Sequence, residues 1–148
     1  MLRSAACLAV LCWAAALSVI DIRERRLPDV LTLTGAVTIL GGCAGCGRGL
    51  PAILGAAALG GLYLSVHLVD PAGLGGGDVK LALGLGALTG AFGLPVWMLS
   101  AIGAPMLTAL LGVSALFRGR GAAAAPAAVP HGPSMCAASL GAVALTVL

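Results

Sequence analysis

The chain has 148 residues, of which 60% are hydrophobic and 9% are charged, and its net charge is +3 at neutral pH. Soluble domains carry about 25% charged residues, so this composition excludes an ordinary soluble enzyme, a disordered chain and a nucleic-acid-binding module, which needs a large basic patch. Six spanning helices of about 20 residues would occupy about 120 residues. We therefore predict an all-α polytopic membrane protein of six transmembrane helices, one domain over 1–148, with the lipid bilayer as partner.

Six apolar segments follow one another along the chain. Their approximate ranges are 4–20, 30–46, 51–69, 79–94, 95–117 and 134–148. The first is expected to be a retained helix and not a cleaved signal peptide, because Arg23, Arg25 and Arg26 follow it whereas only Arg3 precedes it. The Ala- and Pro-rich stretch between Gly121 and Pro130 is typical of a linker.

The positive charges predict the orientation in the membrane. With six crossings, the connections 21–29, 70–80 and 118–133 lie on one side. That side holds six of the eight basic residues, namely Arg23, Arg25, Arg26, Lys80, Arg118 and Arg120. Only Arg3 and Arg48 lie on the other side. Because Lys and Arg accumulate in cytoplasmic loops, we expect these three connections to face the cytoplasm, in the inner membrane.

Two of the five acidic residues stand out by their position. Asp21 ends the first apolar segment, and Asp78 follows three glycines, 75–77, at the start of the fourth. Both are expected at the cytoplasmic boundary of the membrane, where ionisable groups are costly and usually functional. If brought together, one carboxyl keeps a proton while the other acts as base, as in aspartic proteases. The alternative interpretation is that both side chains only cap helix ends.

The other residues with reactive side chains form weaker patterns. His67 is expected to pack at the end of an apolar segment, and His131 to be solvated in a loop. Cys43 and Cys46 have the spacing of metal ligands, but a single pair lacks the two further ligands of a structural zinc site. We therefore expect no metal, and the aspartate chemistry requires no organic cofactor.

Two motifs resemble those of the type IV prepilin leader peptidases. The stretch Asp21-Ile-Arg-Glu-Arg-Arg-Leu-Pro-Asp-Val-Leu-Thr resembles the segment around the first catalytic aspartate of that family, and Gly75-Gly-Gly-Asp-Val-Lys-Leu matches its second motif, G-x-G-D-x-K-L. A third stretch, Val129-Pro-His-Gly-Pro, is similar to the I-P-F-G-P run before the last helix of the family, with His131 in place of Phe. The resemblance spans nearly the whole chain.

The resemblance implies an aspartic endopeptidase of the membrane. Such enzymes cut the short basic leader from a prepilin or pseudopilin at the cytoplasmic face, usually after Gly. Asp21 and Asp78 would then be the catalytic pair, and Gly75 and Gly77 would shape the loop so that the substrate backbone approaches Asp78 closely.

Further motif positions carry over from the same resemblance. Lys80 matches the lysine of the second motif and is a candidate to hold a carboxylate or the substrate backbone. Arg26, Pro28 and Asp29 match positions of the first motif. We interpret Pro28 as setting a helix start and Asp29 as a cap, and not as a third catalytic acid.

The chain departs from the longer members of that family. Those members carry a cytoplasmic region with two Cys-x-x-Cys pairs, and many also N-methylate the new N-terminus. Only eight residues separate Asp21 from Val30, so we expect a peptidase alone, like the short forms of Flp-type pili. One alternative is a peptidase-like protein that has lost activity. The other is a small ion- or proton-coupled transporter that uses the same aspartates. The position of both at one boundary, and the absence of a repeated half, count against it.

Overall fold

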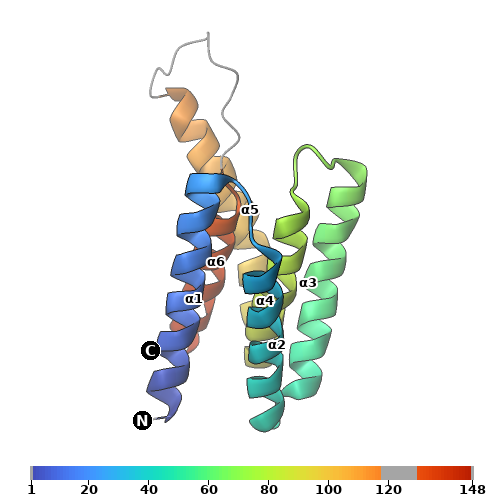
Figure 1. Cartoon of the computed structure of the whole chain (residues 1–148), viewed down its shortest axis with the longest axis vertical. Helices are drawn as coiled ribbons and strands as arrows, with labels where there is room; N and C mark the ends of the chain where they lie inside the picture. Colours follow the sequence, from blue (N-terminus) through green and yellow to red (C-terminus); the bar gives the residue numbers. More distant parts are fainter. Residues whose placement is uncertain (1, 118–129, 148) are drawn as a thin grey trace.

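The computed structural model describes residues 2–117 and 130–147, and over these residues the chain is 88% helical and contains no strand. Its six helices are α1 (Leu2–Glu24), α2 (Asp29–Gly45), α3 (Gly49–Val69), α4 (Gly76–Phe92), α5 (Leu94–Phe117) and α6 (Gly132–Val147). Successive helices run in opposite directions (Figure 1). The predicted all-α polytopic class is confirmed.

Three helices are long and apolar enough to cross a membrane by themselves. They are the segment Ala5–Glu24 of α1, all of α3, and Leu94–Ala115 of α5. The other three helices have 16 or 17 residues, or about 25 Å at 1.5 Å per residue. Large apolar side chains such as Leu62 and Ile102 are exposed on the outside, as a surrounding bilayer favours. The protein is a membrane protein.

The end of α1 and the start of α4 differ most from the predicted ranges, by four and three residues. Helix α1 continues to Glu24, so Asp21 lies in its last turn and not after it. It ends at Glu24, since Arg25 adopts a left-handed φ of 50°. The helix does not resume before Pro28, because a proline disfavours helical backbone at the residue before it, here Leu27. Helix α4 begins at Gly76, so Asp78 lies in its first turn, just before the apolar run that starts at Val79.

The helix directions bring the predicted active-site segments to one end. The connection 25–28, the turn 70–75 and the start of α6 lie at the upper end in Figure 1, while both termini lie at the lower end. Arg48, between α2 and α3, also lies at the lower end and donates from Nη1 to the carbonyl of Ala91, 3.0 Å away. Arg118, Arg120 and most of the expected linker fall outside the described residues.

The helices associate as two groups of three. One group, called the α3 group here, consists of α2, α3 and α4; the other, the α6 group, consists of α1, α5 and α6. Figure 1 shows α1 beside α6, and α2 and α3 on the other side of the molecule. Helix α4 joins the groups because it also contacts α5 and α6.

Glycines allow α3 and α4 to pack with their backbones in contact. A Cβ built on Gly86 would lie 2.5 Å from the carbonyl oxygen of Gly55, and one on Gly90 would lie 2.7 Å from the carbonyl oxygen of Pro51. Small residues at such positions are typical of membrane helices, whose association depends on close packing. The glycines of α4 therefore allow this helix to pack tightly against α3.

Candidate functional site

Asp21 is held at the start of α6. Its side chain is buried, at 7% exposure, and its Oδ2 accepts a hydrogen bond from the backbone N–H of Gly132, 3.0 Å away. Gly132 is the first residue of α6, where N–H groups lack partners within the helix and a negative charge is favoured. The fold thus pairs a carboxylate of the first helix with the beginning of the last.

Asp78 is held by the glycine turn that precedes α4. Gly75 is the N-cap in extended conformation, and its carbonyl accepts the N–H of Asp78 at 3.1 Å. His67, at the end of α3, donates from Nδ1 to the carbonyl of Leu74 at 2.7 Å. These backbone contacts fix the turn, so Asp78 is half-buried at the same end of the molecule as Asp21.

The structure brings the two aspartates to one cavity. Its volume is about 250 Å³. It is lined by Asp21, Arg25, Arg26, Leu27, Gly75, Gly76, Gly77 and Asp78. The residues from the end of α1 and the start of α4 therefore form a single chamber in which both predicted carboxylates and both predicted glycines take part. Arg26, which matches a position of the first motif, also lines the cavity.

The electrostatics of the cavity set its two acids apart. Asp78 precedes the apolar run of α4, and burial, followed by the negative charge of Asp21, raises its pKa to about 6; a backbone hydrogen bond from Gly75 opposes the shift. Asp21 instead accepts the N–H of Gly132. Asp78 therefore keeps its proton to a higher pH than an ordinary aspartate does.

One glycine of the turn, Gly77, has a packing role that the sequence did not reveal. A Cβ on Gly77 would lie 2.9 Å from Cβ of Leu27, a buried side chain at 9% exposure. A Cβ on Gly75 would meet Oδ2 of Asp78 at 3.5 Å and the backbone nitrogen of Gly77 at 4.0 Å, both ordinary contacts. Gly77 therefore makes room for Leu27, which was not among the predicted site residues. The two glycines do not share one purpose.

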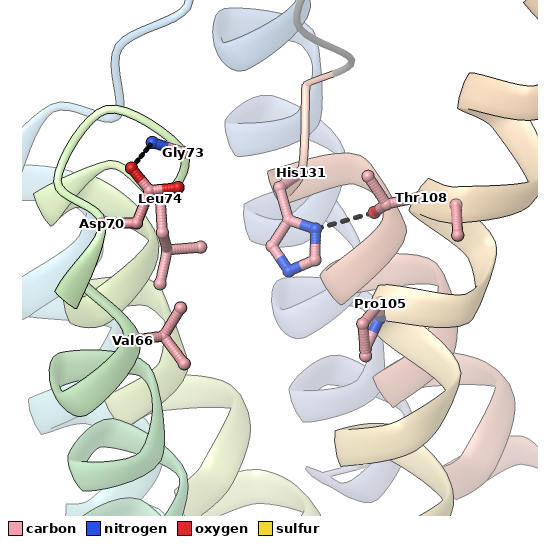
Figure 2. A pocket seen from close by; sticks show the side chains of 8 residues that line it. Val66, Asp70, Gly73, Leu74, Pro105, Thr108 and His131 are labelled. Atoms are coloured by element: carbon pink, nitrogen blue, oxygen red, sulfur yellow. Dashed lines mark hydrogen bonds between the residues drawn. The ribbon is translucent and has the colours of Figure 1, made fainter.

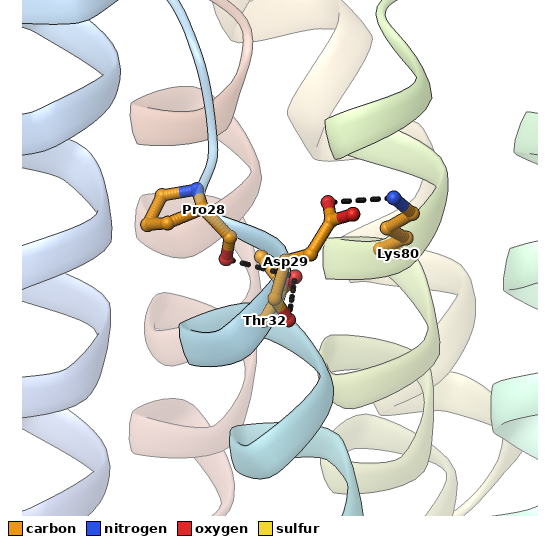
Figure 3. Close-up of polar contacts among 4 residues, drawn as sticks. All are labelled: Pro28, Asp29, Thr32 and Lys80. Atoms are coloured by element: carbon orange, nitrogen blue, oxygen red, sulfur yellow. Dashed lines mark hydrogen bonds and ion pairs between the residues drawn. The ribbon is translucent and has the colours of Figure 1, made fainter.

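Lys80 and Asp29 pair with each other beside the cavity. Lys80 Nζ lies 2.6 Å from Asp29 Oδ1, linking the start of α4 to the start of α2 (Figure 3). The predicted cap at Asp29 is wrong, because Pro28 is the N-cap and no side chain caps this helix. Pro28 does set the helix start, as predicted: its carbonyl accepts the N–H groups of Leu31 and Thr32, each at 3.1 Å.

A second, larger cavity of about 520 Å³ adjoins the same end (Figure 2). Apolar side chains such as Val66 and Pro105 line it, and His131 and Thr108 add polar groups. The expectation of a solvated His131 is wrong: its ring is half-buried and bonds at 2.9 Å to Tyr63 Oη and at 2.7 Å to Thr108 Oγ1. The only sequence feature that distinguished it was a polar residue in an otherwise apolar motif.

The cysteine pair forms no recognised site. Cys43 and Cys46 both carry free thiols. Within residues 2–117 and 130–147, no cluster of three or more His, Cys, Asp or Glu side chains is arranged to hold a metal ion.

Comparison with known proteins agrees with the motifs. Residues 8–113 match the sequence model of the type IV leader peptidase family, a range that includes both aspartates of the cavity. No curated protein and no solved structure gave a match. The family match covers more than two thirds of the chain, in agreement with the predicted resemblance. The chain therefore belongs to the type IV leader peptidase family.

Proposed function

We propose that the protein is an aspartic endopeptidase that removes the short leader from type IV prepilins of the Flp type, or from pseudopilins, by cutting after Gly. The observation that carries this proposal is the shared cavity of Asp21 and Asp78. A leader peptidase must hydrolyse a peptide bond, and a pair of carboxyls in different protonation states is a sufficient catalyst for that reaction. The whole chain, 1–148, would act as one peptidase domain.

In this mechanism Asp21 is the general base and Asp78 the general acid. Asp21 takes a proton from a water molecule, whose oxygen attacks the scissile carbonyl carbon, while Asp78 gives its proton to the carbonyl oxygen. The tetrahedral intermediate then collapses: the C–N bond breaks, the proton on Asp21 passes to the leaving nitrogen, and one hydroxyl proton of the intermediate returns to Asp78 as the carboxyl product forms. The raised pKa of Asp78 and the N–H bound to Asp21 support this division of roles.

The position of the cavity suits a substrate that is itself a membrane helix. The cavity is formed by residues at the end of α1 and the start of α4, which lie at one end of the molecule (Figure 1). The apolar helix of a prepilin can therefore remain in the bilayer while its leader reaches the chamber at the surface. Arg23, Arg25 and Arg26 lie at this end, and basic residues mark the cytoplasmic side. We therefore assign the site to the cytoplasmic face of the inner membrane.

The test is co-expression with a tagged prepilin from the same organism, followed on a gel. The variants are Asp21→Asn and Asp78→Asn, compared at equal membrane abundance. Asp70→Asn is the matched control, because Asp70 lies in the turn before α4 and its Oδ1 accepts the N–H of Gly73, a bond that the amide oxygen of Asn can also accept.

Loss of the leader-sized shift in the two site variants alone is the expected result. Cleavage that survives either substitution would show that the assigned pair is wrong. If the unaltered enzyme cuts no prepilin, the transport alternative gains ground.

A further inference from the structure

The start of α6 contributes to the site at a residue that neither aspartate motif contains. Gly132 donates its N–H to Asp21 Oδ2 at 3.0 Å. A Cβ built on Gly132 would lie 2.7 Å from the same oxygen and 3.2 Å from Cγ of Asp21. Position 132 therefore has no room for a side chain while the carboxylate stays in place. The contact supplies a donor and requires glycine.

His131, the preceding residue, is fixed from two sides. Thr108 donates its hydroxyl proton to the carbonyl of Ala104, 3.1 Å away, so its oxygen accepts from Nδ1–H of His131 at 2.7 Å. The other ring nitrogen, Nε2, then accepts the hydroxyl proton of Tyr63 at 2.9 Å. Burial lowers the pKa of His131 against an opposing effect of Asp21, which favours this neutral ring.

These bonds tie the start of α6 to both helix groups. Tyr63 belongs to α3 and Thr108 to α5. Figure 2 shows the imidazole of His131 directed toward Thr108, and both residues line the larger cavity. A ring held at both nitrogens fixes the backbone that follows it. The next backbone N–H is the one that binds Asp21.

We propose that His131 and Gly132 are positioning residues for Asp21. His131 fixes the start of α6 between α3 and α5, and the N–H of Gly132 orients the Asp21 carboxylate. Both residues act through Asp21, His131 by way of Gly132 and Gly132 by its bond to Oδ2. The catalytic part of this inference rests on the proposed function, whereas the contact between Gly132 and Asp21 can be tested without it.

The contact is tested with the full-length protein in detergent by a double-mutant cycle on Tm. Gly132→Ala is compared with Gly141→Ala, the same change in the same helix at a position where a Cβ meets nothing within 4 Å. Both are made in the natural background and in Asp21→Ala. Gly132→Ala is expected to lower Tm in the natural background only, because Asp21→Ala removes the carboxylate it would strike. An equal loss in both backgrounds overturns the proposal.

The positioning role is tested by kinetics with a prepilin substrate. Gly132→Ala and Thr108→Val are expected to lower kcat, the former on the order of 100-fold, with KM unchanged. Thr89→Val is the control, because Thr89 is buried but donates only within its own helix, to Leu85. A raised KM at unchanged kcat refutes positioning. If no prepilin is cut at all, the proposed function fails, and the Tm cycle still decides the contact.

Discussion

The backbone contact between α3 and α4 predicts an unusually costly Gly→Ala change. A Cβ at position 86 would lie 2.5 Å from the carbonyl oxygen of Gly55 and 2.9 Å from Cβ of Leu59. Ordinary contact begins at 3.4 Å, so the two helices must separate locally by about 0.9 Å. Gly61→Ala, in the interior of α3, places its Cβ in open space and shares the gain in helix propensity. Gly86→Ala should therefore be about 1–3 kcal/mol less stable than Gly61→Ala.

The measurement is the free energy of unfolding in mixed micelles, followed by helical circular dichroism. Prepilin cleavage by the same samples reports on the site, because α4 also carries Asp78, and a displacement on the order of 1 Å can cost about 100-fold in rate. Equal unfolding free energies for Gly86→Ala and Gly61→Ala would refute the reasoning, since the helices would then have room that the close contact denies.

Three further predictions concern the site. Asp78→Asn should be more stable than the natural protein at pH 8 but not at pH 3. The folded Asp78 carboxyl keeps its proton to about pH 6, whereas the unfolded one loses it near pH 3.8, so the stability of the natural protein falls as pH rises between these values. Parallel curves of Tm against pH for the two proteins would contradict this. Either Lys80→Asp or Asp29→Lys alone should lower Tm, and the double variant, which reverses the ion pair, should restore it. The stability lost in each single variant should be at most about 1 kcal/mol, because the pair is exposed. Additive losses in the double variant would show that the ion pair contributes nothing. Gly77→Ala should lower Tm more than Gly75→Ala, whose added methyl makes only ordinary contact, and equal Tm values would show that the turn is not tightly packed.

The sequence predicted the helices and their order because membrane insertion is governed by local hydropathy. An apolar run must become a helix in the bilayer, so counting such runs also fixes which connections share a side. That reasoning was enough to bring Asp21 and Asp78 to one end. The exact ends of α1 and α4 were missed, since Arg23 and Glu24 are polar yet continue the helix for one more turn.

The remaining features of the site depend on contacts between distant segments. The N–H of Gly132 lies 111 residues from Asp21 in the chain, and nothing near either residue indicates the pair. Lys80 and Asp29 were each identified as motif positions, but their partnership follows from the packing of α2 on α4. Leu27 was missed because an isolated leucine between arginine and proline has no periodicity to mark it as buried.

The division of the helices into two groups has a consequence for how the protein can be regulated. Asp21 belongs to the α6 group and Asp78 to the α3 group. A small rigid-body shift between the groups changes the separation of the two carboxyls directly, even when each group keeps its internal packing. If the proposed function holds, a molecule that separates the two groups would stop hydrolysis without touching an aspartate, and the measured effect would be loss of turnover in an otherwise intact fold.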